Sequence, residues 1–133
     1  MKGITRIILP NAATAKKEQD VCVVIFYDAT VPACAQHIQL GLEEEGVPSM
    51  IVLQDSLTDL NQAAKNAADL SRLAVGVSAN QSKIVLHHQK LPHNQPLLQM
   101  QQNSPNARLI GKNAARLVKG LPLVLETHLE NHT

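Results

Sequence analysis

Aromatic side chains are almost absent from this chain of 133 residues. It has no tryptophan, and its two aromatic residues are Phe26 and Tyr27. Proteins that grip single-stranded nucleic acids stack the bases on aromatic rings, so that binding mode is nearly excluded. An excess of one charge is absent too, because twelve Lys and Arg oppose eleven Asp and Glu for a formal net charge of +1. The chain therefore lacks the broad electrostatic footprint of proteins that bind nucleic acids or anionic membranes.

Cysteine and long apolar runs are scarce as well. Cys22 and Cys34 show neither CxxC spacing nor a larger even set of cysteines, so we expect two buried thiols in a reducing cytoplasm. The longest apolar run in the first twenty residues is Ile7 to Leu9, before Pro10, which is too short for a signal peptide or a membrane span. We predict a polar leader over 1–20, one domain over 21–125 and a frayed tail over 126–133.

Strand-like and helix-like segments alternate along the predicted domain. Apolar, β-branched runs predict strands at 21–27, 49–54, 72–77 and 83–88, with a short fifth strand within 96–100. Apolar residues at helical spacing predict a helix that stops near Gly46, a second over 57–70 and a last over about 110–119. The break before residue 83 suits a hairpin, so that strand should run antiparallel. This order favours an α/β fold, a three-layer α/β/α sandwich whose mostly parallel sheet has about five strands.

One helix face predicts close packing. In the second helix, Leu60, Ala63, Ala67 and Leu70 share one face. Because alanine is small, we expect this helix to approach its sheet closely.

No phosphate-binding loop is evident. Gly111 and Lys112 form a Gly-Lys pair, but a P-loop needs a glycine five positions earlier and a Ser or Thr after the lysine. Asn106 and Asn113 occupy those two positions. A nucleotide site of this kind is therefore not predicted.

The adjacent histidines His87 and His88 are poor partners for one metal ion. Neighbouring residues of a strand point to opposite faces of the sheet, so the two imidazoles cannot easily share an ion. A ligand role for one of them stays open, beside a surface and a packed histidine. By residue chemistry, the chain is more typical of a binding domain than of an enzyme.

Basic residues form a stripe on the last predicted helix. Lys112, Arg116 and Lys119 fall at i, i+4 and i+7 beside the apolar face. Such a stripe is either a solvated face or a docking surface for an acidic partner, with Asn113 available for a backbone contact. The sequence leaves both interpretations open.

Three consecutive glutamates end the first predicted helix. Glu43, Glu44 and Glu45 precede Gly46, where the negative end of the helix dipole should repel them. At about 100° per residue, Glu44 points roughly 160° away from the buried stripe. Glu43 and Glu45 flank that stripe, where nearby Lys or Arg or simple hydration can relieve them. Glu44 has the clearest path outward to a second molecule, with which it could share a cation.

Four segments resemble a known family. "LGLEEEGVP", "AVGV", "KIVLHHQKLP" and "GKNAARLVKGLP" occur in the same order in the small subunit of the reactivating factor for coenzyme B12-dependent diol and glycerol dehydratases. The match runs from about Ile38 to Pro122, and its last segment is specific. The resemblance implies a fold related to the dehydratase medium subunit, with strand order 2-1-3-4-5 and one antiparallel strand.

The resemblance also implies a mechanism and partners. A large ATPase subunit would bind ATP or ADP and assemble with this chain as an α2β2 heterotetramer. Together they would release damaged cobalamin from inactivated dehydratase by subunit exchange, so this chain would be a non-catalytic subunit without a cofactor of its own. It would work in the cytoplasm, free or within a bacterial microcompartment.

The site residues follow from the same resemblance. Glu44, the middle glutamate of the EEEG motif, would be the ligand to a Mg²⁺ ion shared with the large subunit. The partner interface would include Lys112, Asn113, Arg116 and Lys119, which lie in the most specific segment.

Two other functions remain open from the sequence. The chain could be a medium-subunit-like component that helps a B12-dependent dehydratase to hold its cofactor. It could also be a free-standing small-molecule or phosphocarrier module, because one fold serves many functions. Cobalamin binding by the isolated chain would favour the first, and a monomer with a ligand-filled pocket would favour the second.

Overall fold

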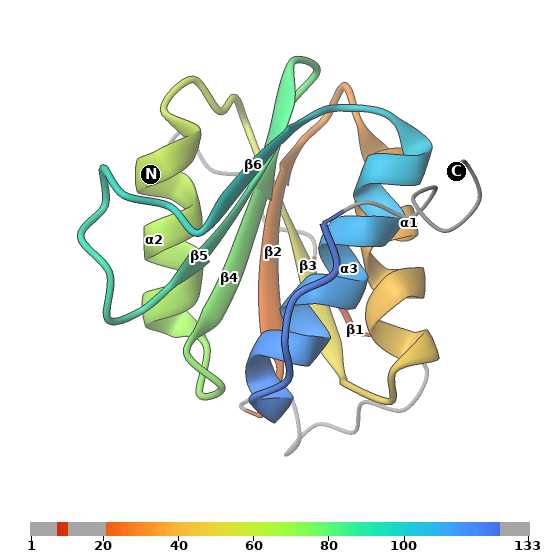
Figure 1. Ribbon diagram of the computed structural model, residues 1–133. Helices are drawn as coiled ribbons and strands as arrows, with labels where there is room; N and C mark the ends of the chain where they lie inside the picture. Colours follow the sequence, from red (N-terminus) through yellow and green to blue (C-terminus); the bar gives the residue numbers. More distant parts are fainter. Residues whose placement is uncertain (1–7, 11–20, 126–133) are drawn as a thin grey trace.

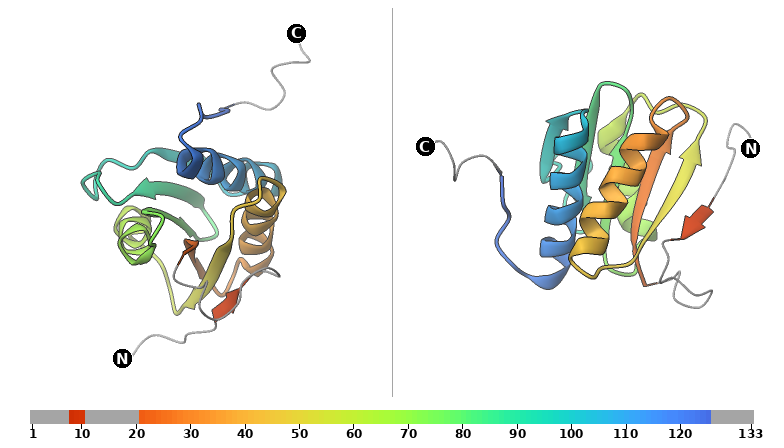
Figure 2. Two further views of the ribbon diagram at one scale, coloured as in Figure 1. Left: turned by 90° about the horizontal axis from the view of Figure 1, so that it is seen from below. Right: turned by 90° about the vertical axis from the view of Figure 1, so that its right-hand side faces the viewer.

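The computed structural model describes residues 8–10 and 21–125, which form a mixed sheet with helices on both faces (Figure 1). The strands are β1 (Ile8–Pro10), β2 (Val23–Asp28), β3 (Ser49–Gln54), β4 (Val75–Ala79), β5 (Lys83–His88) and β6 (Leu98–Gln101). The helices are α1 (Pro32–Glu44), α2 (Leu60–Leu70) and α3 (Ser104–Lys119). Helices α1 and α3 cover one face and α2 covers the other, as Figures 1 and 2 show. Within these ranges, no helix is long and apolar enough to cross a membrane.

The sheet has the order β1-β3-β2-β4-β5-β6. Strand β2 pairs in parallel with β3 and β4, β5 is antiparallel to β4, and β6 is antiparallel to β5. Counted from β2 onward, the order is 2-1-3-4-5 with β5 as the one strand of opposite direction. The predicted α/β/α sandwich, its antiparallel hairpin and its strand order are confirmed.

The sheet also has a sixth strand that the sequence did not predict. Strand β1 pairs antiparallel with the edge of β3, with Leu9 opposite Ile51. Its three residues fall inside the segment expected to be a polar leader. Three residues are too few to show the alternation of side chains that marks a strand in a sequence. Strand β1 is defined by its pairing with β3, which its own residues do not reveal. The rest of that leader and the predicted tail over 126–133 lie outside the described residues.

Strand β2 is covered on both faces. Val23, Ile25 and Tyr27 join the core beneath α1 and α3, whereas Val24 and Phe26 pack on the side of α2. This alternation explains why its sequence is continuously apolar: both of its faces are buried.

Helix α2 approaches the sheet closely, as its alanines predict. A Cβ added at Gly76 of β4 would lie 2.1 Å from the backbone nitrogen of Ala68 and 2.6 Å from the oxygen of Ala64. The buried Ser78 hydroxyl donates to the Leu60 carbonyl at 2.7 Å. Leu70, expected on the buried face, is instead 66% exposed because the helix ends there.

Helices α1 and α3 touch through their backbones. A Cβ at Gly41 would lie 2.3 Å from the Arg108 oxygen, and one at Gly111 would lie 2.1 Å from the Ile38 oxygen. Any larger residue at either glycine would force the two helices apart.

Several predicted boundaries are wrong, including the start of α2, which was expected at 57 and lies at Leu60. Helix α3 begins at Ser104, about six residues before the predicted start, because the Asn103 side chain accepts the Asn106 N–H at 2.8 Å and Pro105 suits the first turn. Strand β4 occupies 75–79 and not 72–77. Ala74, with φ 66°, ends a turn that begins at Ser71, so the extended backbone starts later.

Replacing Gly111 by alanine should destabilise the fold. In an ordinary helix interior this change stabilises by about 1 kcal/mol. Here the new methyl group would collide with the Ile38 carbonyl, so we expect a loss of about 1–3 kcal/mol in the free energy of unfolding. Urea denaturation measures it. Leu40→Ala, at an exposed position on α1, should cost less than about 1 kcal/mol. A Gly111→Ala variant as stable as the parent would contradict the close helix contact.

Candidate functional site

Three carboxylates mark the C-terminal end of α1. The helix ends at Glu44, Glu45 follows as its C-cap, and Gly46 turns the chain with φ 77°. Glu43 and Glu44 are exposed, and Glu45 is half-buried. The last turn of α1 contains no basic residue, so the helix itself offers no cation to these charges.

The compensating cations come from α3. Arg108 donates from its Nη2 atom to Oε2 of Glu44, and the Lys119 Nζ atom lies 3.6 Å from Oε1 of Glu45. The Glu44 side chain nevertheless stays 51% exposed, and that of Arg108 49% exposed. Within the chain, Glu44 and Glu45 are therefore each paired with a cation of α3.

Arg108 also controls the ionisation of Glu44. Its hydrogen bond holds the pKa of the Glu44 carboxyl below the usual range. Desolvation opposes this shift, while the charges of Arg108 and Lys112 add to it. Glu44 is therefore a carboxylate at neutral pH, the form that ligates a metal ion.

Glu44 fits one position in the coordination sphere of a divalent cation. Mg²⁺ takes six oxygen ligands, yet within 21–125 no three His, Cys, Asp or Glu residues form a group that could hold a metal. Arg108 is bonded to Oε2 of Glu44, which leaves Oε1 as the atom that could face an ion. The other ligands would have to come from a second molecule and water.

An open cleft lies beside Glu44, between α1 and α3. Its volume is about 450 Å³. The lining residues are His37, Glu44, Ser104, Pro105, Arg108, Leu109 and Lys112. The lining contains one acidic side chain, Glu44, and two basic ones, Arg108 and Lys112, so positive charge exceeds negative charge in the cleft.

Two predicted interface residues make hydrogen bonds within the chain. Asn113 is fully buried, and its amide exchanges two hydrogen bonds of 2.7 Å with the backbone of Val124. Arg116 donates from Nε to the Pro122 carbonyl at 2.6 Å. Together they hold segment 121–125 back along α3 (Figure 1). The expectation that Asn113 is available to a partner is wrong, because its own chain already supplies the backbone that it binds.

Arg108 is the site residue that the sequence interpretation missed. The predicted start of the last helix, near residue 110, left Arg108 outside it. With the helix beginning at Ser104, Arg108 lies one turn before Lys112 and extends the basic stripe. The Asn-Ser-Pro signal at 103–105 could have located that start.

Comparisons with known proteins place the chain in a family. Residues 20–124 match the family described as dehydratase medium subunit. The propanediol dehydratase-reactivating factor small subunit of Citrobacter freundii is 41% identical over 102 residues, which cover 75% of this chain and 87% of that protein. The chain belongs to the family of dehydratase-reactivating factor small subunits.

Solved structures of this family share the fold. A chain of the diol dehydratase-reactivating factor complexed with ADP and Mg²⁺ superposes with a TM-score of 0.72 at 32% identity, covering 79% of this chain and 98% of that one. A chain of a glycerol dehydratase reactivase has the same TM-score at 34% identity, covering 79% and 97%. The resemblance seen in the sequence and its implied relation to the medium subunit are confirmed. A small subunit of this family has a large subunit as its partner.

The Gly-Lys pair of this small subunit lies inside a helix. Gly111 and Lys112 are in the middle of α3, with Gly111 against α1 and Lys112 at the cleft. A P-loop presents its backbone N–H groups from a loop before a helix. The prediction that these residues form no P-loop is therefore confirmed.

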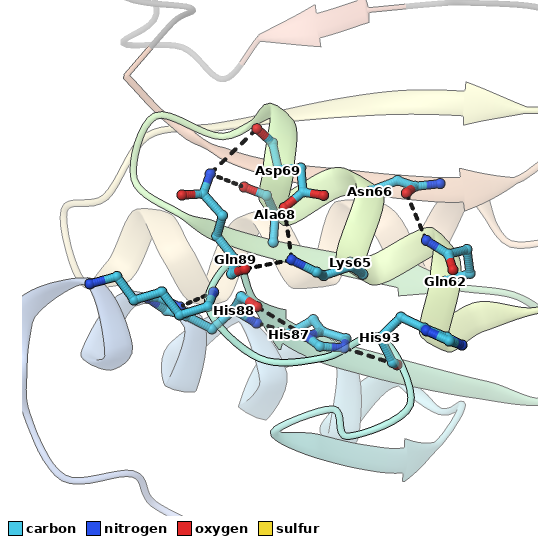
Figure 3. A network of polar contacts seen from close by, with 10 residues as sticks. Gln62, Lys65, Asn66, Ala68, Asp69, His87, His88, Gln89 and His93 are labelled. Atoms are coloured by element: carbon cyan, nitrogen blue, oxygen red, sulfur yellow. Dashed lines mark hydrogen bonds and ion pairs between the residues drawn. The ribbon is translucent and has the colours of Figure 1, made fainter.

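The tandem histidines have different environments (Figure 3). His87 is fully buried, its Nδ1 accepts the His88 N–H at 3.0 Å, and its Nε2 donates to the His93 carbonyl at 3.1 Å. Both ring nitrogens are thus occupied, which makes His87 a packed histidine. His88 is half-buried, and desolvation, followed by the charge of Lys90, lowers its pKa. His87 therefore has no free ring nitrogen for a metal ion shared with His88.

Removing the Arg108 cation should raise the pKa of Glu44. In Arg108→Gln the carboxylate loses its hydrogen bond and the nearer charge, so its pKa should return toward the usual range, as a ¹³C NMR titration of the carboxyl group can show. Because the folded-state pKa is the depressed one, the pair stabilises the fold above the unfolded-state pKa of Glu44. That contribution disappears as the pH falls through the folded-state pKa.

Lys112→Gln is the matched control. It removes the same charge but only the weakest of the influences that lower the pKa of Glu44, so its effect should be smaller. Equal shifts in both variants would contradict a dominant role for the Arg108 hydrogen bond.

Proposed function

We propose that this small subunit is a non-catalytic exchange subunit. With a large ATPase subunit, it releases damaged cobalamin from an inactivated coenzyme B12-dependent diol or glycerol dehydratase. The supporting observation is that one segment matches both the reactivating-factor small subunits and the dehydratase medium-subunit family. A chain with the fold of a client subunit can occupy the same place against a third protein. The large subunit can therefore leave this chain and bind the medium subunit, and the resulting steric conflict loosens the cobalamin.

The nucleotide belongs to the large subunit in this proposal. A solved relative is complexed with ADP and Mg²⁺, whereas Gly111 and Lys112 of this chain are inside α3 and offer no phosphate loop. The assembly is an α2β2 heterotetramer, located with its client in the cytoplasm, free or within a microcompartment.

The Mg²⁺ ion joins the two subunits through Glu44. This carboxylate is ionised, exposed and able to supply one ligand, which suits a cation whose other ligands come from the large subunit and water. Lys112 and Lys119 share the α3 face next to the glutamates and belong to the partner surface. Asn113 and Arg116 support that surface by holding segment 121–125.

Reconstitution tests the proposal. The chain should co-purify with a large ATPase subunit, and the pair should restore turnover to dehydratase inactivated by glycerol or oxygen, while either subunit alone should restore much less. Failure to form a complex would overturn the proposal. The match to the medium-subunit family keeps one other candidate, a cofactor-holding subunit. Tight cobalamin binding by the isolated chain would favour that candidate.

Neutralising Glu44 should weaken assembly only when Mg²⁺ is present. Glu44→Gln keeps the size of the side chain and lies outside the core, so the fold should be retained. We expect about tenfold weaker binding to the large subunit with Mg²⁺ and little change with a chelator, measured by calorimetry. Glu43→Gln removes the same charge from the exposed neighbour and should bind like the parent. If both variants bind like the parent in Mg²⁺, Glu44 is not a metal ligand.

The isolated chain should neither bind ATP tightly nor hydrolyse it. Nothing in its described helices presents backbone amides, a lysine and a magnesium-binding hydroxyl in the order that phosphates require. Calorimetry with MgATP should show no binding at micromolar concentration, and the large subunit alone should retain its ATPase activity. Micromolar affinity in the isolated chain would contradict this division of roles.

A further inference from the structure

The cleft beside Glu44 has unbalanced charge. Arg108 and Lys112 oppose the single carboxylate of Glu44, and the first turn of α3 at Ser104 and Pro105 adds the positive end of a helix dipole without an acidic residue. In the free chain, the ion pair between Arg108 and Glu44 balances one of the two cations, which leaves Lys112 and the helix dipole unbalanced.

That ion pair can exchange. Both side chains are about half exposed, and a single hydrogen bond joins them, so water and salt screen the attraction. If a cation bound to the partner also binds Glu44, three positive groups, namely that cation, Arg108 and Lys112, lie in the cleft beside a single carboxylate. Such close positive charges repel one another unless further anions enter the cleft.

We propose that this cleft is a docking surface for acidic side chains of the large subunit, and that Arg108 exchanges Glu44 for one of their carboxylates during assembly. The inference rests on the proposed function, because it takes the large subunit as the occupant. Charge complementarity selects the chemistry, since two cations and a helix N-terminus favour a carboxylate over a basic or apolar side chain. The guanidinium of Arg108 suits the geometry of a carboxylate, and Lys112 adds a second, more compact charge.

Zero-length cross-linking tests the exchange directly. A carbodiimide activates a carboxylate, and a lysine Nζ atom in contact with it displaces the activating group to form an amide. In the variant Arg108→Lys, the new lysine of the isolated chain should link to Glu44. In the Mg²⁺ complex it should link to an Asp or Glu of the large subunit, as should the native Lys112, and peptide mass spectrometry identifies each link.

Two controls make the test specific. Lys90 is exposed in the loop after β5 and should give no link to the large subunit. Lys112→Glu should weaken binding by about tenfold, whereas Lys90→Glu should change it by less than about twofold. Circular dichroism checks that each variant is folded.

The outcomes separate the inference from the proposed metal bridge. If the lysine introduced by Arg108→Lys links only to Glu44 in the complex and Lys112 gives no link between subunits, the docking surface is wrong even though assembly occurs. If both links between subunits form to the same extent in metal-free buffer as in Mg²⁺, the docking surface is supported and the proposed metal bridge is wrong. If the parent chain forms no complex with the large subunit, both are overturned.

Discussion

The backbone contact between α1 and α3 is the constraint on which the candidate site depends. Gly41 faces the Arg108 carbonyl, and Gly111 faces the Ile38 carbonyl, at distances that leave no room for a Cβ atom. Gly41 and Glu44 are three residues apart and so lie on neighbouring positions of one helix face. The contact that packs the two helices therefore also brings Arg108 beside Glu44 and Lys119 beside Glu45.

The two faces of the sheet differ in how their polar groups are satisfied. On the α2 face, Lys65 bonds Asp69 and the Gln89 carbonyl, and the Gln89 amide reaches the end of α2, so the polar groups serve the chain itself (Figure 3). On the α1 and α3 face, an exposed ion pair borders an open cleft. A surface ion pair contributes little to stability, so an exposed pair beside a cleft is readily exchanged for contacts with another molecule. The face with α1 and α3 is accordingly the one suited to a replaceable partner.

Subunit exchange requires a fold that matches a client and a surface that can be released. The match to the dehydratase medium-subunit family meets the first requirement. In the proposed exchange, the polar lining of the cleft serves the second, because polar contacts give specificity and rate more than raw affinity. A large apolar interface in the same place would hold the two subunits together too firmly to be exchanged.

The sequence by itself determined the architecture of the domain. Strand β2 reads as apolar throughout because both faces are buried, the alanines of α2 predict its close approach, and the hairpin at β5 predicts a reversed strand. These features are local, since each depends on the spacing of residues within one element. The family and its motifs were also recognisable along the chain.

Only the tertiary structure decided which groups meet at the site. Glu44 and Arg108 are 64 positions apart, and no spacing within one helix can reveal a pair that two helices bring together. Asn113 reads as an available polar residue on a basic stripe, yet the return of segment 121–125 buries it against Val124. Long-range hydrogen bonds and ion pairs depend on where separate elements pack, and that placement follows from the close approach of Gly41 and Gly111, which no local pattern encodes.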